Sequence, residues 1–306
     1  MKAEHSSIDV ANIWRTGERR HVRSILVGAL GLVRRRPLGA VALILLLLIV
    51  GLSMLAPVIA PYDVAEINAY ERLQSPNSTY IMGTDALGRD QFSRVLFGTR
   101  NDLIVCSIGV LIGIVAGTVL GLATGYLAGG WLDLGLQRLI DVQMTVPPLV
   151  LAIAIITAIN PGTTAIVVVI SLLLLPSTAR VLRGAAIAER NRAYVEAAQA
   201  IGCSNIRTMF RHVLPNMFGP LMVLVSLALG NALLIEGGLS FLGYGPPPPT
   251  PTLGLMLSGD NRNAFRSAWW LALFPGLVMA LAIFAFNTLG DVLRDAFDPR
   301  LRGARS

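Results

Sequence analysis

Long runs of apolar residues without a charged side chain dominate this chain. They cover residues 39–56, 103–128, 142–179, 213–235 and 267–290. About 20 apolar residues in a helix cross the ~30 Å hydrocarbon core of a bilayer, and the third run is roughly twice that length. Because Asn160, Pro161 and Gly162 interrupt it midway with residues typical of turns, it predicts two helices. The pattern therefore predicts an all-α membrane protein with six transmembrane helices.

The basic residues predict how these helices are oriented. Six crossings place both termini on one side of the membrane, and short loops rich in Lys and Arg stay in the cytoplasm. With the N-terminus inside, 19 of the 25 basic residues are cytoplasmic, so we expect both termini there. The net charge of +7 follows this topology, and it gives little support for a nucleic-acid partner.

The residues that carry most enzyme chemistry are scarce. Lys2 is the only lysine, which excludes a phosphate-binding loop ending in Gly-Lys-Ser/Thr. The three histidines are all predicted to be cytoplasmic, and neither cysteine has a His or Cys at the spacing of a metal site. Cys106 is expected in the outer half of the second helix and Cys203 in the cytoplasmic loop, too far apart for a disulfide. We expect no catalytic, metal or cofactor site in this chain.

Glycine recurs at every fourth residue of the second apolar run, at Gly109, Gly113, Gly117, Gly121, Gly125 and Gly129. Small residues at this spacing let neighbouring helices approach closely. The stripe drifts by about 40° per step around a helix of 3.6 residues per turn. We therefore expect a central packing helix whose stripe contacts more than one neighbour.

The predicted cytoplasmic loop between the fourth and fifth helices begins with a short helix. Tyr194, Ala197, Ala198 and Ile201 follow the spacing of one helical face. Gly202 comes next, and glycine is the residue most tolerant of a left-handed C-terminal cap. The first short helix is therefore expected to end at this glycine.

A second short helix is predicted after Ser204, which suits an N-cap, and it should end near Leu214 and Pro215. Its apolar positions predict one face, formed by Ile206, Met209, Phe210 and Val213. In the first helix, the carboxylate of Glu196 and the small alanines beside it suit docking of a partner. The alternative is an amphipathic helix pair lying on lipid headgroups.

The outer segments also carry local patterns. Asp85 between two glycines predicts a capped turn, and the apolar residues after it predict an interfacial helix with Phe92, Val95 and Leu96 on one face. Gly245 and four following prolines predict a stiff extended spacer, and the apolar piece 253–257 is too short to span. This outer segment is either a lid or a simple spacer.

Glu236 lies close to the outer end of the fifth predicted helix. A carboxylate at that depth either faces a translocation path or lies among the headgroups, where its charge costs little. Both interpretations stay open.

The cytoplasmic loop carries a known pattern, in which Glu196-Ala197-Ala198 is followed by Gly202 and, after further residues, by Leu214-Pro215. It resembles the EAA loop of permease subunits in binding-protein-dependent ABC importers. The family usually has Ile where His212 stands, and Val213 supplies an aliphatic residue one place later. The match precedes the penultimate helix of a six-helix chain, as in that family.

Three further segments look like the dipeptide, oligopeptide and nickel group, and within it the C-type subunit. They are Gly83-Thr84-Asp85-x-Leu87-Gly88-Arg89-Asp90-x-x-Ser93-Arg94-x-x-x-Gly98-x-Arg100, Leu239-Ser240-Phe241-Leu242-Gly243, and Leu289-Gly290-Asp291-x-Leu293-Arg294-Asp295-x-x-Asp298-Pro299-Arg300. Relatives often carry Trp where Leu253 precedes Gly254. The resemblance covers nearly the whole chain from about Val33 onward.

This resemblance implies the type I ABC importer permease fold in three parts. They are a cytoplasmic basic arm (1–38), the first transmembrane helix with the outer loop (39–101), and a five-helix core (102–306). The core contains the coupling loop, at about 180–215, and a short cytoplasmic tail. The implied setting is the bacterial cytoplasmic (inner) membrane, with the chain crossing the lipid several times.

The implied function is that of a permease for di- or oligopeptides that forms half of a path with a homologous B-type subunit. Two ABC ATPase subunits would hold ATP and Mg and bind the coupling residues, and an extracytoplasmic binding protein would deliver the solute. The implied coupling residues are Glu196, Ala197, Ala198, Gly202, Leu214 and Pro215. The alternatives are a self-contained secondary transporter or pore, and a membrane scaffold.

Overall fold

The computed structural model describes residues 37–297 of the 306. In that part the elements are helices, and no strand occurs; Thr84 and Asp90 form an isolated bridge. The helices are α2 (Pro37–Met54), α3 (Ala56–Ile59), η1 (Ala69–Glu71), α4 (Gln91–Tyr126), α5 (Trp131–Thr145), α6 (Pro148–Ile159), α7 (Thr163–Arg190), α8 (Ala193–Ala200), α9 (Asn205–Thr208), the π-helix η2 (Met209–Val213), α10 (Leu214–Asn216), α11 (Phe218–Phe241), α12 (Leu253–Met256), α13 (Gly259–Ala264) and α14 (Trp270–Phe297). Nearly all of the predicted N-terminal arm and the end of the tail lie outside the described residues.

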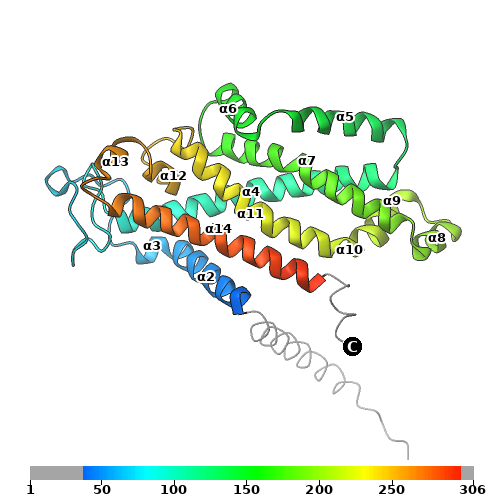
Figure 1. Cartoon of the computed structure of the whole chain (residues 1–306), viewed down its shortest axis with the longest axis horizontal. Coiled ribbons are helices and arrows are strands. Elements are labelled where there is room, and N and C mark those ends of the chain that lie inside the picture. Colours follow the sequence, from blue (N-terminus) through cyan, green and yellow to red (C-terminus); the bar gives the residue numbers. More distant parts are fainter. Residues whose placement is uncertain (1–36, 298–306) are drawn as a thin grey trace, which may run out of the picture.

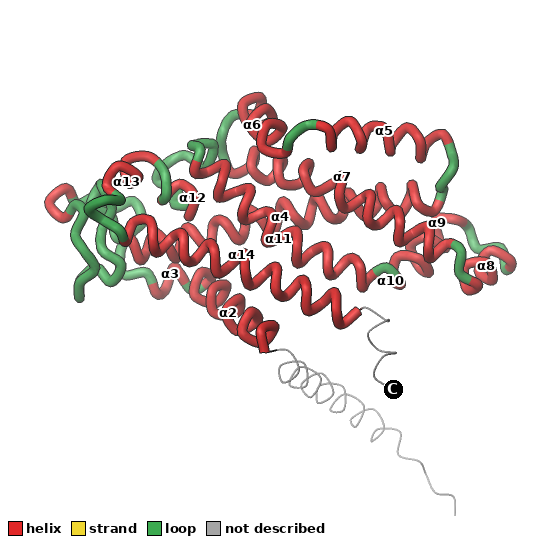
Figure 2. The backbone as a smooth tube through the Cα atoms, in the orientation of Figure 1, coloured by secondary structure: helices red, strands yellow, loops and turns green. Residues whose placement is uncertain are grey.

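The long helices form an elongated bundle (Figures 1 and 2). Helix α4 packs most extensively against α7, and α11 packs against α14, with α2 along α14. The short helices α8, α9 and α10 gather at one end of the bundle, which we call the loop end. Helices α12 and α13 lie at the opposite end, near the turns that precede α4 (Figure 1).

Five helices are long and apolar enough to cross a bilayer, namely α2, α4, α7, α11 and α14. The third predicted span, in the first half of the run 142–179, corresponds to α6 and the end of α5, and these two helices form a pair bent by 95°. The bend follows from Pro147 and Pro148, because proline lacks an amide donor and forces the residue before it out of the helical conformation. Val146 is accordingly extended, with ψ 129°. The described structure thus has five continuous candidate spans, and a sixth where the bent pair crosses the bilayer as one broken span.

Helix α4 is longer than its apolar run predicts. It begins at Gln91, where the carboxylate of Asp90 accepts a 2.8 Å hydrogen bond from the amide of Ser93 and caps the first turn. No proline interrupts the next 36 residues. The prediction of a separate interfacial helix with Phe92, Val95 and Leu96 is therefore wrong, since all three belong to the start of α4.

The glycine stripe of α4 lies against α7. A methyl group built on Gly109 would lie 2.9 Å from Ile170, and one built on Gly121 would lie 2.6 Å from the carbonyl oxygen of Ala179. Gly113, Gly117 and Gly125 also meet α7. The expectation of several neighbours is wrong for these five, because helices that interlock along their i±4 ridges cross at an angle that lets one partner follow the stripe.

The described ends of the chain lie near each other. Gly39 at the start of α2 packs against the side chain of Val292, near the end of α14. Both described ends therefore lie on the same side of the helix bundle, as an even number of crossings requires.

Candidate functional site

The loop between α7 and α11 is a pair of helical segments with a glycine between them. The amide of Gly202 donates to the carbonyl of Gln199 at 2.9 Å, and the amide of Cys203 donates to that of Ala198 at 3.0 Å, which closes α8. Gly202 has φ +82°, and no atom lies within 4 Å of a methyl group built on it. The glycine is therefore required by its backbone conformation and not by lack of space.

The second segment continues further than predicted. Ser204 occupies the N-cap position of α9, although its side chain makes no cap hydrogen bond. The helix then widens into η2, where the amide of Leu214 reaches back to the carbonyl of Met209. The predicted end near Leu214 and Pro215 differs by one residue from the observed end at Asn216, because α10 accommodates Pro215 in its first turn, where a missing amide donor is tolerated. The break before α11 comes at Met217.

Apolar contacts fix this loop to the bundle. Val195 and Val213 are fully buried, in one cluster with Leu122 of α4 and Leu182 of α7. A displacement of the loop would therefore act directly on the ends of α4 and α7, because its buried side chains pack against both helices.

A polar contact adds to this attachment. Tyr126 is the last residue of α4 and only 3% exposed. Its hydroxyl accepts a 2.9 Å hydrogen bond from Nε2 of Gln199 and lies 3.4 Å from Oδ1 of Asn205. The guanidinium of Arg190 lies 5.9 Å from the centre of its ring. Tyr126 was not among the predicted functional residues, and its one signal in the sequence is a polar aromatic residue at the end of a glycine-rich apolar run.

The start of α8 is held to α7 by a second tyrosine. The hydroxyl of Tyr194 donates to Oε2 of Glu189 at 2.7 Å. Burial and this hydrogen bond raise the pKa of Tyr194 to about 12. The hydroxyl therefore remains a donor at neutral pH.

The loop leaves large apolar side chains uncovered. Ile201 is 82% exposed, Ile206 72% and Phe210 47%. We call these three the exposed loop residues. The prediction that Ile206, Met209, Phe210 and Val213 share one face is wrong, because the second and fourth of these are buried while the other two are exposed.

The predicted coupling residues fall into two groups. Glu196, Ala197, Gly202 and Pro215 are exposed. Ala198 is 6% exposed, so its methyl group packs inside this chain, and Leu214 is half-buried. A docking partner would thus meet only one of the two alanines.

At the opposite end the structure brings two carboxyl groups together inside the bundle. Asp102 of α4 and Glu236 of α11 are each 1% exposed and interact electrostatically. Oδ2 of Asp102 accepts a 2.9 Å hydrogen bond from the amide of Leu253, and Oε1 of Glu236 accepts one of 2.6 Å from Ser240. The other oxygen of each carboxyl group has no hydrogen-bond partner in the described structure. This burial excludes the headgroup position considered for Glu236.

Asp102 precedes the charge-free run of the second predicted helix by one residue, and it was not predicted as a functional residue. Its place inside α4 means that the 245–257 segment is anchored to the bundle through Leu253. In the described part of the chain, no group of three or more His, Cys, Asp or Glu side chains is arranged to hold a metal ion. Both cysteines are free, as expected.

Comparison with known proteins shows to which family this chain belongs. Residues 109–303 match the family described as binding-protein-dependent transport system inner membrane component. Residues 31–76 match the N-terminal TM domain of oligopeptide transport permease C. The chain belongs to this permease family.

Curated relatives match along most of their length. The dipeptide transport system permease protein DppC of Haemophilus influenzae is 41% identical, over 86% of this chain and 90% of the relative. The glutathione transport system permease protein GsiD of Pectobacterium atrosepticum is 37% identical, over 94% and 92%. The di/tripeptide transport system permease protein DppC of Pseudomonas aeruginosa is 38% identical, over 86% and 88%.

The resemblance inferred from the loop and the outer motifs is thereby confirmed. The permease is a multi-pass inner membrane component of an ABC transport system and not an enzyme. Such a system also contains a partner permease, ATPase activity on other subunits and a binding protein. This membership excludes a secondary transporter that works without ATPase partners.

Proposed function

We propose that this permease is the C-type subunit of an importer for di- or oligopeptides. It pairs with a homologous B-type subunit, and the two enclose one translocation path. The relatives named for dipeptides, di/tripeptides and glutathione support this substrate class, because all three are small peptides. An extracytoplasmic binding protein delivers the peptide to the end of the bundle that carries α12 and α13.

The exposed loop residues support the proposal that ATPase subunits dock on this loop. They form an uncovered apolar surface on a loop whose other side is packed into the bundle. Two ABC ATPase subunits, which hold ATP and Mg, dock on the loops of the two permeases. Glu196 contributes a carboxylate to a basic group of the ATPase.

The contacts of the loop give a mechanism for coupling. When the ATPases close on ATP, the loop moves with the surface that binds it, and Val195 and Tyr126 transmit this displacement to α4 and α7. The loop must bind the ATPase with different free energies in the two states, because equal binding shifts no equilibrium. Rotation of these helices then changes the side from which the path is open.

Co-purification tests this proposal. The full transporter is extracted in mild detergent through a tag on this permease, and the ATPase subunit is quantified. We expect Ile206→Asp to lower the recovered ATPase at least about tenfold, as loss of about 1.4 kcal/mol of binding requires. Ile67→Asp is the matched control, since Ile67 is 59% exposed and lies before α4, away from the loop. Equal recovery for both variants would contradict the docking assignment.

Ligand retention tests the substrate class separately. The cognate binding protein is purified under native conditions, and the bound solute is identified by mass spectrometry. A retained di- or oligopeptide supports the proposal, whereas a retained metal chelate without peptide overturns the substrate assignment.

A further inference from the structure

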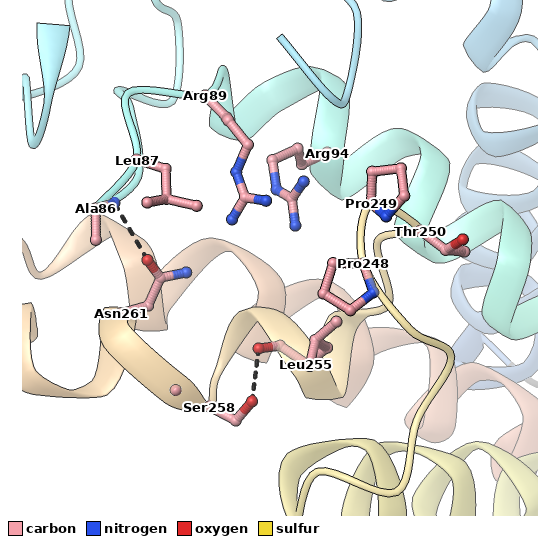
Figure 3. A pocket seen from close by; sticks show the side chains of 11 residues that line it. Ala86, Leu87, Arg89, Arg94, Pro248, Pro249, Thr250, Leu255, Ser258 and Asn261 are labelled. Atoms are coloured by element: carbon pink, nitrogen blue, oxygen red, sulfur yellow. Dashed lines mark hydrogen bonds between the residues drawn. The ribbon is translucent and has the colours of Figure 1, made fainter. Parts of the chain in front are cut away.

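A charged pocket opens at the end of the bundle opposite the coupling loop (Figure 3). It encloses about 200 Å³. One wall is the turn that leads into α4 together with the first turn of that helix, with Leu87, Arg89 and Arg94. The other is the segment after α11, with Pro248, Leu255 and Ser258.

Two arginines reach into this pocket, and the described side chains set a single carboxylate against them. Nε of Arg89 donates to Oδ2 of Asp85 at 2.6 Å, and Nε of Arg94 lies 3.6 Å from the same oxygen. The other oxygen of Asp85 already accepts hydrogen bonds from two backbone amides, that of Leu87 at 2.8 Å and that of Arg89 at 2.9 Å. This carboxylate therefore compensates the charge of only one of the two guanidinium groups.

The arginines retain hydrogen-bonding capacity. The side chain of Arg94 is only 3% exposed, and its buried Nε makes no hydrogen bond. One of its terminal nitrogens donates to the carbonyl of Val64 at 2.9 Å. The terminal nitrogens of Arg89 make no hydrogen bond to any described residue, and both guanidinium groups point into the space between the walls (Figure 3). A recessed positive charge of this kind is stabilised by an anion that accepts these donors.

The remaining walls are largely apolar. Leu87, Pro248, Pro249 and Leu255 surround the guanidinium groups (Figure 3). Sites that hold a whole small ligand usually measure about 300–1,000 Å³, so this pocket suits one end of a larger molecule. A carboxylate next to a short side chain has the matching chemistry, with the anion on the arginines and the alkyl or aryl group on the prolines and leucines.

We propose that this pocket binds the C-terminal residue of a peptide through its free carboxylate. The inference rests on the proposed function, since dipeptides, tripeptides and glutathione differ in length and side chains but share a C-terminal carboxylate. Arginine suits this role because its planar guanidinium group binds a carboxylate through two parallel hydrogen bonds. The permease thereby holds the peptide at the outer entrance after the binding protein releases it.

Direct binding to the full-length permease in lipid nanodiscs tests the proposal without the binding protein. The probes are alanyl-phenylalanine, its C-terminal amide and its N-acetyl form, and saturation-transfer NMR with a competition titration gives the affinity. Amidation removes a charge-assisted contact and should weaken binding at least about tenfold. N-acetylation should leave binding unchanged. Equal binding of the acid and the amide overturns the proposal.

Three variants locate the site. Arg89→Gln and Ser258→Phe should each weaken binding of the free acid, the first by removing the charge and the second by filling the pocket without altering either arginine. Arg266→Gln is the control, because Arg266 is exposed and does not line the pocket. Unchanged affinity of the free acid in both pocket variants also overturns the proposal.

A final comparison separates this inference from its competitors. If the free peptide does not bind, but Arg89→Gln and Ser258→Phe prevent the peptide-loaded binding protein from docking on the complete transporter, the occupant is a carboxylate of that protein and the substrate assignment is wrong. The proposed function itself fails on a different observation, namely that the wild-type permease neither recovers an ATPase nor supports peptide uptake.

Discussion

Nε2 of Gln199 in the coupling loop donates a 2.9 Å hydrogen bond to the hydroxyl of Tyr126, the residue at which α4 ends. Tyr126→Phe removes this acceptor but keeps the ring packed in its cluster, at a cost of about 0.5–1.5 kcal/mol to the attachment of the loop. In proteoliposomes with the complete transporter, we expect fewer peptides to be imported per ATP hydrolysed. Tyr70→Phe, at a 99% exposed position, is the control. An unchanged ratio of import to hydrolysis would show that the contact does not transmit force.

The glycine stripe of α4 predicts opposite effects for two similar substitutions. Gly121→Ala places a methyl group 2.6 Å from the carbonyl of Ala179, so it should destabilise the protein by about 1–3 kcal/mol through overpacking. Gly184→Ala is its counterpart on α7, where no atom lies within 4 Å of the new methyl group. There, the better helix propensity of alanine adds up to about 1 kcal/mol. Thermal unfolding in detergent measures both, and equal melting temperatures would contradict the packing.

Substitutions of Gly202 should affect transport without affecting folding. Gly202→Asp should reach the membrane in normal amounts, because there is space around the glycine, but it should abolish uptake by placing a negative charge where the ATPase docks. Gly202→Asn tests the cause, since asparagine tolerates a φ of +82° and carries no charge. We expect it to retain most of the uptake. Normal uptake by the aspartate variant would show that this corner does not contact the motor.

The buried carboxyl groups of Asp102 and Glu236 lead to a prediction about stability. The protein should tolerate the loss of the charge of Asp102, but not the loss of its hydrogen bond. Asp102→Asn preserves an acceptor for the amide of Leu253 and removes a buried ionisable group, so the thermal stability should be unchanged or higher. Asp102→Leu leaves that buried amide unpaired, which costs about 1–3 kcal/mol. Differential scanning fluorimetry compares the two. If leucine is tolerated as well as asparagine, the segment containing Leu253 is not anchored through this contact.

Cys203 reports on which side the coupling loop lies. It is half-buried in the loop, whereas Cys106 is only 1% exposed within α4, so a hydrophilic maleimide should modify Cys203 alone. We expect labelling in inverted membrane vesicles and none in intact spheroplasts. Cys203→Ser should abolish the signal in the vesicles. Labelling of Cys203 in spheroplasts would place the loop outside and remove any contact with a cytoplasmic ATPase.

The apolar runs predicted where the transmembrane helices lie, because spanning a bilayer requires little more than length and low charge. They did not predict where α4 begins. The charges at Arg94 and Asp102 placed both residues outside the charge-free run, yet both side chains are buried, one against Val64 and Asp85 and the other against Leu253. Hydrophobicity alone does not reveal such pairings, because the partners come from distant parts of the chain.

In the coupling loop, too, some features were predictable from the sequence and others were not. The glycine corner at Gly202 was predictable, since its backbone conformation is a local property that few other residues adopt. The orientation of Phe210 was not, because the π-helix that precedes Leu214 shifts the side chains relative to regular helical spacing. The contact between Gln199 and Tyr126 joins residues 73 positions apart and follows from packing of the whole bundle.

Helix α4 has 36 residues, so it measures about 54 Å at a rise of 1.5 Å per residue, well beyond the ~30 Å of hydrocarbon that it must cross. Its first turns hold Arg94 in the charged pocket and its last residue holds the loop through Tyr126. The charged pocket and the attachment of the loop are thus both formed by the same continuous helix. In the proposed mechanism, a tilt that the ATPases impose at one end of this helix displaces the guanidinium group at the other end, so peptide binding and ATP-driven motion are linked through a single helix.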